Sequence, residues 1–452
     1  MDLPPGPRGL PLVGHLGLLR DPLTALVRAH EQLGDAVCFR VGPIRFLSVA
    51  DPAMAHHVLV GNHRNYVKSR SYQGLRLVLG DGLVTSEGTH WRRQRKLVQP
   101  AFHRQRLAGL ADTMARCVGE RLDDWDRRPR PEADIHDEMM QLTMRIVGRT
   151  LFGADLGEDL GALGPVITTC LHKANDYAEA LVRIPLWVPT PSNLRFARAK
   201  RQLDAIVHDI IEQRRRGEPR DDVLGMLMAA TDETGTERMS DQQLRDEVMT
   251  LFMAGHETIA NAMSWTFKLL HQHPAVAERV RVEARAVLGG RAPSFEDLPT
   301  LTYTSQVIDE SMRLHPPVWI VERQALAEDR LGPWRVPAGT IVGVSPWVIH
   351  RHRGQWDDPE RFDPERFAPE RAEGRPKHAY LPFGAGPRIC IGNHFARMEA
   401  TIILATVLQR YSVEILDPQR VRFDPQVTLR PLGGMPGRLH RLPPGDPVER
   451  AA

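Results

Sequence analysis

The stretch FGAGPRICIG, residues 383–392, sets one cysteine, Cys390, among small residues and a proline, just before an apolar segment that we expect to be helical, Phe395–Leu408. Gly386 permits a tight turn, and Gly392 allows a close backbone approach. Backbone N–H groups near the sulfur can stabilise a thiolate, and Phe383 can shield it from water. The loop therefore predicts a presented thiolate that acts as a metal ligand or as a nucleophile. The alternative for a lone cysteine is an inert core residue.

The remaining cysteines, Cys38, Cys117 and Cys170, lie far apart and form no CxxC pair. This spacing argues against a disulfide framework and against a zinc ribbon, and it fits a reducing compartment. No stretch approaches the roughly 20 apolar residues that span a bilayer, and the N-terminus lacks the apolar core of a signal peptide. We therefore expect a cytoplasmic protein without a membrane span or anchor.

The composition is that of a globular protein. The chain has 452 residues, of which 42% are hydrophobic, and 59 Lys and Arg stand against 56 Asp and Glu. The net charge of +3 is too small for nucleic-acid binding over a broad basic surface, so we expect no nucleic-acid partner. No linker or fixed-period repeat interrupts the chain between Arg20 and Leu439, which predicts a single domain over residues 1–452.

Hydrophobic periodicity indicates a mainly α fold with a minor β-sheet. A hairpin is expected within Asp35–Val49, around Gly42 and Pro43. Apolar residues at three- and four-residue spacing predict helices, and β-branched runs predict later strands. The helices are Leu107–Asp124, Leu203–Arg215 and Ala275–Leu288, and the strands lie in Trp334–Val344 and Val421–Leu429.

One predicted helix is long enough to cross the domain. Ser240 and Gln243 form a capping-box start, and the apolar face continues until Pro274, about 50 Å at 1.5 Å per residue. Its middle reads AGHET, residues 254–258, where a glycine costs about 1 kcal/mol relative to alanine and Thr258 can bond a preceding carbonyl. Such local weakness at a buried place indicates function. The alternative is a close helix contact that Gly255 tolerates.

In order and spacing, these motifs resemble the cytochrome P450 family of haem-thiolate monooxygenases over nearly the whole chain. The cysteine loop matches the family's haem-binding signature at Phe383, Gly386, Arg388, Cys390 and Gly392. The resemblance implies a triangular prism with a long central helix over haem b, and it implies that the Cys390 thiolate is the proximal iron ligand.

The central helix resembles the family's distal helix. The resemblance places Ala254 and Gly255 at the oxygen-binding kink and makes Glu257 and Thr258 the acid and alcohol pair. It implies reductive activation of O2 and insertion of one oxygen atom into the substrate. Thr258 is then expected to hydrogen-bond the oxygen and help deliver protons. Glu257 either relays protons from solvent or forms an internal salt bridge.

Further charged residues match structural and haem-binding positions of the family. Glu310, Arg313 and Arg366 are similar to its structural triad, although a solvated helix face is the alternative for such charges taken alone. Trp91, Arg95, Arg323 and Arg388 match its propionate contacts, since arginine pairs bidentately with carboxylates. On the helix that carries Trp91, the basic residues Arg92, Arg93 and Lys96 are candidates for contact with an acidic redox partner, or they form a solvated face. A departure is HRHR at residues 350–353, where the family more often has His-Arg-Asp-Pro.

The family's pocket positions are mostly apolar in this chain and predict a hydrophobic substrate, such as a terpenoid, a carotenoid or a fatty acid. The segment Tyr177–Trp187 is expected to contribute. The individual candidates are Leu75, Val78, Leu83, Val84, Phe252, Val318, Trp319 and Ile320.

We expect no fused reductase, and the resemblance then implies that electrons come from NAD(P)H through a separate ferredoxin or flavodoxin and its reductase. We expect a monomer. Two other functions stay open. A haem-thiolate peroxygenase or isomerase would keep Cys390 and need no reductase, and a haem carrier or sensor would have no enzymatic activity.

Overall fold

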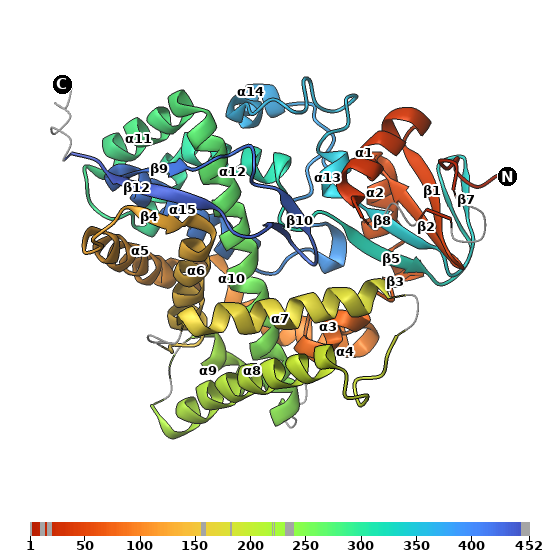
Figure 1. Cartoon of the computed structure of the whole chain (residues 1–452), viewed down its shortest axis with the longest axis horizontal. Helices are drawn as coiled ribbons and strands as arrows, with labels where there is room; N and C mark the ends of the chain where they lie inside the picture. Colours follow the sequence, from red (N-terminus) through yellow and green to blue (C-terminus); the bar gives the residue numbers. More distant parts are fainter. Residues whose placement is uncertain are drawn as a thin grey trace.

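Helix α10, Asp241–Gln272, passes through the centre of the molecule, with other helices around it and the largest sheet to one side (Figure 1). The computed structural model describes residues 2–9, 14–15, 20–154, 160–180, 183–218, 220, 222–230 and 239–443. The predicted capping box is present: Gln243 N donates to Ser240 Oγ at 3.2 Å, and Ser240 N donates to Gln243 Oε1 at 3.0 Å. Helix α10 ends just before Pro274, as the sequence predicts, and Pro274 is the first residue of the next helix.

The fold is mainly α-helical with small sheets, which confirms the predicted class. The helices are α1 Pro22–Leu33, α2 Pro52–His56, α3 Tyr72–Leu79, α4 Gly88–Val98, α5 Arg104–Asp126, α6 Ile135–Leu151, α7 Leu160–Glu179, α8 Pro191–Arg216, α9 Val223–Ala229, α10, α11 Pro274–Leu288, α12 Thr302–Leu314, α13 Pro346–Ile349, α14 Pro369–Ala372 and α15 Asn393–Arg410. The strands are β1 Ala36–Val41, β2 Ile44–Val49, β3 Tyr66–Lys68, β4 Glu132–Asp134, β5 Val321–Ala325, β6 Asp329–Leu331, β7 Trp334–Val336, β8 Ile341–Val344, β9 Tyr411–Ile415, β10 Phe423–Pro425, β11 Leu429–Pro431 and β12 Pro436–Arg441.

The largest sheet has the strand order β1-β2-β8-β5-β3. Its first two strands form the predicted hairpin, and Gly42 at the turn has a φ of 56°, a region that glycine adopts without strain. Strand β8 lies parallel to β2 and antiparallel to β5, so the segment after α12 returns to the N-terminal hairpin. The predicted strand regions at 334–344 and 421–429 hold β7 and β8, and β10 and the start of β11.

The middle of α10 packs closely against α6, and one of its side chains donates a hydrogen bond to a backbone carbonyl of the same helix. A Cβ added at Gly255 would lie 3.0 Å from Val147 Cγ2 of α6, so this glycine does allow a close helix contact. Thr258 Oγ1 donates to the Ala254 carbonyl at 2.9 Å, the back-bond expected from the sequence. The close helix contact considered as the alternative is therefore confirmed, and the functional interpretation of this segment stays a prediction.

A buried charge cluster joins α12 to the loop before α14. Glu310 Oε2 accepts from Arg313 Nε at 2.6 Å, and Glu310 Oε1 accepts from Arg313 Nη2 at 2.8 Å. The Arg366 Nε atom lies 3.4 Å from the same oxygen, and Asp363 N donates to it at 2.9 Å. Arg313 Nη1 also donates to the His350 carbonyl at 2.8 Å, so the unusual 350–353 segment is tied to the cluster. All three side chains are buried, so the solvated-face alternative is wrong for them.

We predict that Arg313→Met lowers the free energy of unfolding by about 3–5 kcal/mol, because it leaves the Glu310 carboxylate buried beside only part of its partners. Urea unfolding followed by circular dichroism measures the loss. Arg335→Met is the matched control, because it breaks the exposed pair with Glu328 and should change stability by less than about 1 kcal/mol. Equal effects of the two variants would contradict the prediction.

Candidate functional site

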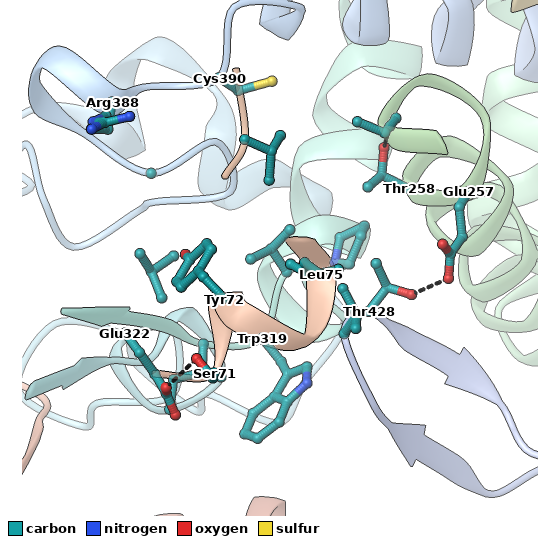
Figure 2. Close-up of a pocket in the computed structure, with 18 of the residues that line it drawn as sticks. Ser71, Tyr72, Leu75, Glu257, Thr258, Trp319, Glu322, Arg388, Cys390 and Thr428 are labelled. Atoms are coloured by element: carbon teal, nitrogen blue, oxygen red, sulfur yellow. Dashed lines mark hydrogen bonds between the residues drawn. The ribbon is translucent and has the colours of Figure 1, made fainter. Parts of the chain in front are cut away.

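A cavity of about 770 Å³ lies between α10, α3, α7, β5 and the cysteine loop. Figure 2 shows Cys390 on one side of it, Thr258 on the α10 side, and Tyr72, Leu75 and Trp319 across from the sulfur. The walls are mostly apolar, with polar groups gathered at particular places. The cavity is thus suited to a large apolar ligand whose polar groups are few and fixed in position.

The cysteine loop holds its sulfur in one orientation. Cys390 N donates to the Phe383 carbonyl at 3.0 Å, which closes the loop across a short 3-10 helix, Gly386–Arg388. Gly386 has a φ of 71°, and a Cβ there would lie 2.0 Å from the Leu59 carbonyl oxygen. The loop therefore requires glycine at this position. At Gly392, by contrast, the predicted close approach is not found within the chain, since an added Cβ would meet only Phe102 at 3.8 Å.

The Cys390 side chain lies deep in the protein and is exposed because it faces the cavity. Burial raises the pKa of its thiol, while the Gly392 N–H and the Arg95 guanidinium act to lower it. Phe383 also lines the cavity, and its ring lies 5.5 Å from the Arg397 guanidinium. A sulfur that faces a large cavity, with an N–H group and a guanidinium that favour its thiolate, is placed to bind a ligand atom.

Four cations line the cavity at the edge near the cysteine loop: Lys68, Arg95, Arg323 and Arg388. Arg388 lies 3.8 Å from the centre of the Trp91 ring and donates to the Ser86 carbonyl at 2.9 Å. Arg95 Nη1 donates to the Ile389 carbonyl at 2.9 Å, so it also fixes the residue before the cysteine. The structure thus brings Trp91 together with all three arginines.

The basic groups at this edge are buried and lie close to one another, and both effects oppose their positive charge. Burial lowers the pKa of Arg388 to about 10; Glu87 opposes that shift, and the nearby Arg323 adds to it. Burial, Arg388 and Arg323 also lower the pKa of Lys68 well below its usual range. Lys68 was missed by sequence analysis, because a single lysine in a short strand carries no pattern. An anionic group bound here would relieve the repulsion among these cations.

The acidic residue of α10 is bound to the C-terminal strands. Glu257 is buried, and its Oε1 accepts from Arg430 Nη2 at 2.6 Å and from Thr428 Oγ1 at 2.5 Å. Figure 2 shows the carboxylate turned toward Thr428. Its salt bridge is therefore made with β11 and not within the helix. Sequence analysis gave no role to Thr428 or Arg430, which lie more than 170 residues away along the chain.

Residues Ala254, Gly255, Glu257 and Thr258 all line the cavity. Seven of the eight predicted pocket residues do so as well: Leu75, Val78, Leu83, Val84, Val318, Trp319 and Ile320. A polar edge was not predicted. There Ser71 Oγ donates to Glu322 Oε2 at 2.6 Å, and Tyr72 lies beside them (Figure 2).

One of the pocket predictions is wrong, and another is confirmed only in part. Phe252 does not line the cavity; it lies on another face of α10, with its ring 6.5 Å from that of Phe152 and 5.1 Å from that of His256. Of the segment 177–187, the described residue that lines the cavity is Ala178, and Trp187 faces outward with 83% of its surface exposed. Residues 181 and 182 lie outside the described residues. Periodicity cannot tell which buried helix face meets a cavity and which meets another helix.

Comparison with known proteins places the chain in a family. The family model described as Cytochrome P450 matches residues 4–435. The chain belongs to the cytochrome P450 family. Among curated relatives, "Cyclooctatin synthase" of Streptomyces melanosporofaciens is 38% identical over 94% of this chain and 92% of its own length. "Pentalenene oxygenase" of Streptomyces avermitilis is 35% identical over 94% of this chain and 93% of its own length.

The fold agrees with this assignment. The heme domain of cytochrome P450DA superposes with a TM-score of 0.89 at 24% identity and covers 98% of this chain and 99% of that chain. The protein is thus a P450 monooxygenase, an oxidoreductase whose family implies a haem cofactor. Among the residues that the structure describes, no helix is both long and apolar enough to cross a bilayer.

The residues present fit haem. Cys390 offers a soft sulfur donor at the wall of a cavity of sufficient breadth, and the excess cations at one edge suit the two carboxylates of a porphyrin. The Trp91 ring stacks against the Arg388 guanidinium and holds it at the basic edge of the cavity. The donor set and the charge distribution therefore agree with the family's cofactor.

We predict that Val318→Trp weakens the binding of a lipophilic azole by about tenfold, because the larger ring fills space in the cavity. Phe252→Leu should leave that affinity unchanged and lower the free energy of unfolding by about 1–2 kcal/mol, because Phe252 packs in the core. Titration followed by difference absorption spectroscopy measures the first effect and urea unfolding the second. Weaker azole binding in Phe252→Leu together with unchanged binding in Val318→Trp would indicate that Phe252 lines the cavity.

Proposed function

We propose that this P450 monooxygenase hydroxylates or epoxidises a terpenoid or a similar alicyclic hydrocarbon. The observation that carries the proposal is the Cys390 sulfur at the wall of a broad, mostly apolar cavity. The relatives support the substrate class, since the names pentalenene and cyclooctat-9-en-7-ol denote an alkene and an unsaturated alcohol. Carotenoids and fatty acids are the alternatives. Electrons are proposed to come from NAD(P)H through a separate ferredoxin or flavodoxin and its reductase.

The proposal assigns the haem site to residues at two places on the cavity wall. Cys390 binds the iron as a thiolate, and Arg95, Arg323, Arg388 and Trp91 hold the propionates together with Lys68. When bound, the haem supplies reductive activation of O2 and transfer of one oxygen atom to the substrate. Phe383 excludes water from the sulfur, and Gly386 lets the loop reach its position. Gly392, which no neighbour in the chain requires to be glycine, leaves space for the group itself.

On the opposite wall, Thr258 and Glu257 are proposed to handle protons. Thr258 offers a hydroxyl whose proton is held toward the Ala254 carbonyl and can be turned into the cavity. Glu257 accepts hydrogen bonds from Thr428 and Arg430, which hold its carboxylate at the cavity wall, where it can take up and release a proton. Ala254 has only a methyl side chain and Gly255 has none, which leaves room beside Thr258. The apolar side chains that line the cavity, among them Leu75 and Ile320, then orient the substrate through the shape of the cavity.

Cys390→Ala should abolish the haem-thiolate absorption band of the reduced, CO-treated protein, because no other described cysteine lines the cavity. Cys170→Ala is the matched control, because this buried thiol lies outside the cavity and its loss should leave the band in place. An unaltered band in Cys390→Ala would exclude sulfur ligation at this residue.

Thr258→Ala should uncouple NAD(P)H consumption from product by about tenfold, because the α10 wall of the cavity loses the hydroxyl proposed to deliver protons. Thr169→Ala on α7 is the control, since that hydroxyl makes the same i−4 bond, to Pro165, on an exposed surface. The ratio of product to NAD(P)H with a turned-over substrate is the measurement. Equal ratios in both variants would remove Thr258 from the proposal.

Turnover with a ferredoxin, its reductase and NADPH should exceed turnover with H2O2 alone. The comparison separates a monooxygenase from the peroxygenase alternative, which needs no reductase. Product formed only with H2O2 would establish that alternative. A failure of every reductase and oxidant with every lipophilic substrate would favour a haem carrier or sensor.

A further inference from the structure

A row of polar side chains runs along one face of α10 and leads away from the cavity. Glu257, Asn261 and Ser264 follow at spacings of four and three residues, which places them on one helix face, over about 10 Å of the helix axis. All three side chains are buried, and of the three only Glu257 lines the cavity. We name this row the polar stripe. Its members need hydrogen-bond partners, because burial separates them from bulk water.

Thr428 joins the first two residues of the polar stripe. Asn261 Nδ2 donates to Thr428 Oγ1 at 3.1 Å, and Thr428 Oγ1 donates to Glu257 Oε1 at 2.5 Å. Figure 2 shows the second of these bonds, with the Glu257 carboxylate turned toward the C-terminal strands. The carboxylate therefore has its hydrogen-bond partners on the side of α10 that carries the polar stripe.

His136, in the first turn of α6, meets the other end of the polar stripe. Helix α6 packs along α10, with β4 at its N-terminal end (Figure 1). The His136 Nδ1 atom lies 3.3 Å from Ser264 Oγ, and Ser264 Oγ donates its own proton to the Ala260 carbonyl at 2.6 Å. The hydroxyl oxygen is thus the acceptor, and His136 Nδ1 is the donor. The His136 ring is half-buried, so the polar stripe extends from the cavity to a side chain that solvent reaches.

Charge couples His136 to the acid at the cavity. Burial lowers the pKa of His136 to about 4; Arg430 adds to that shift, and Glu257 opposes it. The ring is therefore neutral at pH 7. A neutral imidazole has one nitrogen that donates and one that accepts, so it can take a proton on Nε2 while it releases one from Nδ1.

Three buried polar atoms near Glu257 make no hydrogen bond among the described residues: Asn261 Oδ1, Arg430 Nε and His256 Nε2. Arg430 is bound to Glu257 through Nη2, and the pKa of His256 responds to the charges of both. Buried atoms of this kind are normally bonded to ordered water. No hydrogen bond between these described side chains joins Asn261 directly to Ser264, so ordered water beside Asn261 fits the gap in the polar stripe.

We propose that His136 and the polar stripe carry protons from solvent to Glu257. The His136 ring takes a proton on Nε2 and releases the Nδ1 proton to Ser264 Oγ. Ser264 releases its own proton to the water beside Asn261, and that water protonates the Glu257 carboxylate. Each carrier regains a proton as it gives one, and Glu257 returns to its ionised form when it gives its proton to the cavity.

The inference rests on the proposed function, because it supplies the protons that Glu257 is proposed to handle. His136, Asn261 and Ser264 act through Glu257 and are positioning residues. Their placement joins α6, α10 and the C-terminal strands in one path.

The first test is a high-resolution crystal structure of the holoenzyme. We expect ordered water within hydrogen-bond distance of Asn261 Oδ1, continuing to Ser264 Oγ. In Asn261→Leu, whose side chain has nearly the same size and no polar atom, this water should be absent. Asn261 Oδ1 and Ser264 Oγ bonded only to protein atoms would overturn the proposal, whether or not the protein oxidises a substrate.

His136→Gln separates proton transfer from packing, because the amide can still donate to Ser264 but cannot pass a proton from one ring nitrogen to the other. We expect the ratio of product to NADPH consumed to fall about threefold, and the solvent isotope effect in D2O to rise about twofold. The measurement uses a ferredoxin, its reductase, NADPH and a sesquiterpene that the unmodified protein turns over.

His30→Gln is the matched control and should change neither quantity. His30 Nε2 lies 2.9 Å from Ser48 Oγ, burial lowers the pKa of His30 to about 4, and its side chain does not line the cavity. In the same way, Ser264→Ala should act like His136→Gln, whereas Thr266→Val should not. Thr266 also makes a buried i−4 bond on α10, to the Ala262 carbonyl, but lies outside the polar stripe.

Equal coupling in His136→Gln and His30→Gln would overturn the proposal. So would a loss of coupling in His136→Gln that comes with weaker azole binding or a lower thermal midpoint, because the loss then reflects packing. An unmodified protein that forms no product with any reductase contradicts the proposed function instead. The water positions in the crystal structure then decide whether the path exists.

Discussion

The close approach of Gly386 to the Leu59 carbonyl is the contact on which the site depends. Any side chain at position 386 would overlap that oxygen, and the left-handed φ there lets the loop turn back so that Cys390 N can reach the Phe383 carbonyl. Arg95 adds a bond from α4 to the residue before the cysteine. Segments that are hundreds of residues apart thus determine the direction of one sulfur atom.

Two of the charge clusters among the described residues differ in how their charges are balanced. At Glu310, Arg313 and Arg366 share one buried carboxylate, and backbone carbonyls accept from Arg313, whereas the buried Arg366 Nε makes no hydrogen bond among the described residues. At the edge of the cavity, Lys68, Arg323 and Arg388 repel one another, and Glu87 offsets this only in part. The first cluster serves stability. The second leaves positive charge at the cavity wall, which suits the binding of an anion.

The ion pair of Glu257 with Arg430 changes how the centre of α10 is understood. The sequence motif in this helix shows only that an acid, Glu257, directly precedes an alcohol, Thr258. The acid is in fact anchored to the C-terminal strands, and Thr428, which bonds to it, also lines the cavity. The C-terminal hairpin of β10 and β11 is thereby part of the site, although it contains no motif of its own.

The amino-acid sequence by itself determined the long helix with its capping box, the N-terminal hairpin, the glycine-rich cysteine loop and the resemblance to the family. These depend on neighbours in the chain, where spacing and residue type are sufficient. The tertiary structure decided that Phe252 packs in the core, that Lys68 joins the basic edge, that Glu257 meets Arg430 and that Trp187 faces outward. Each of these depends on which distant segment approaches a given helix face, and periodicity only shows that a face is apolar, without showing what covers it.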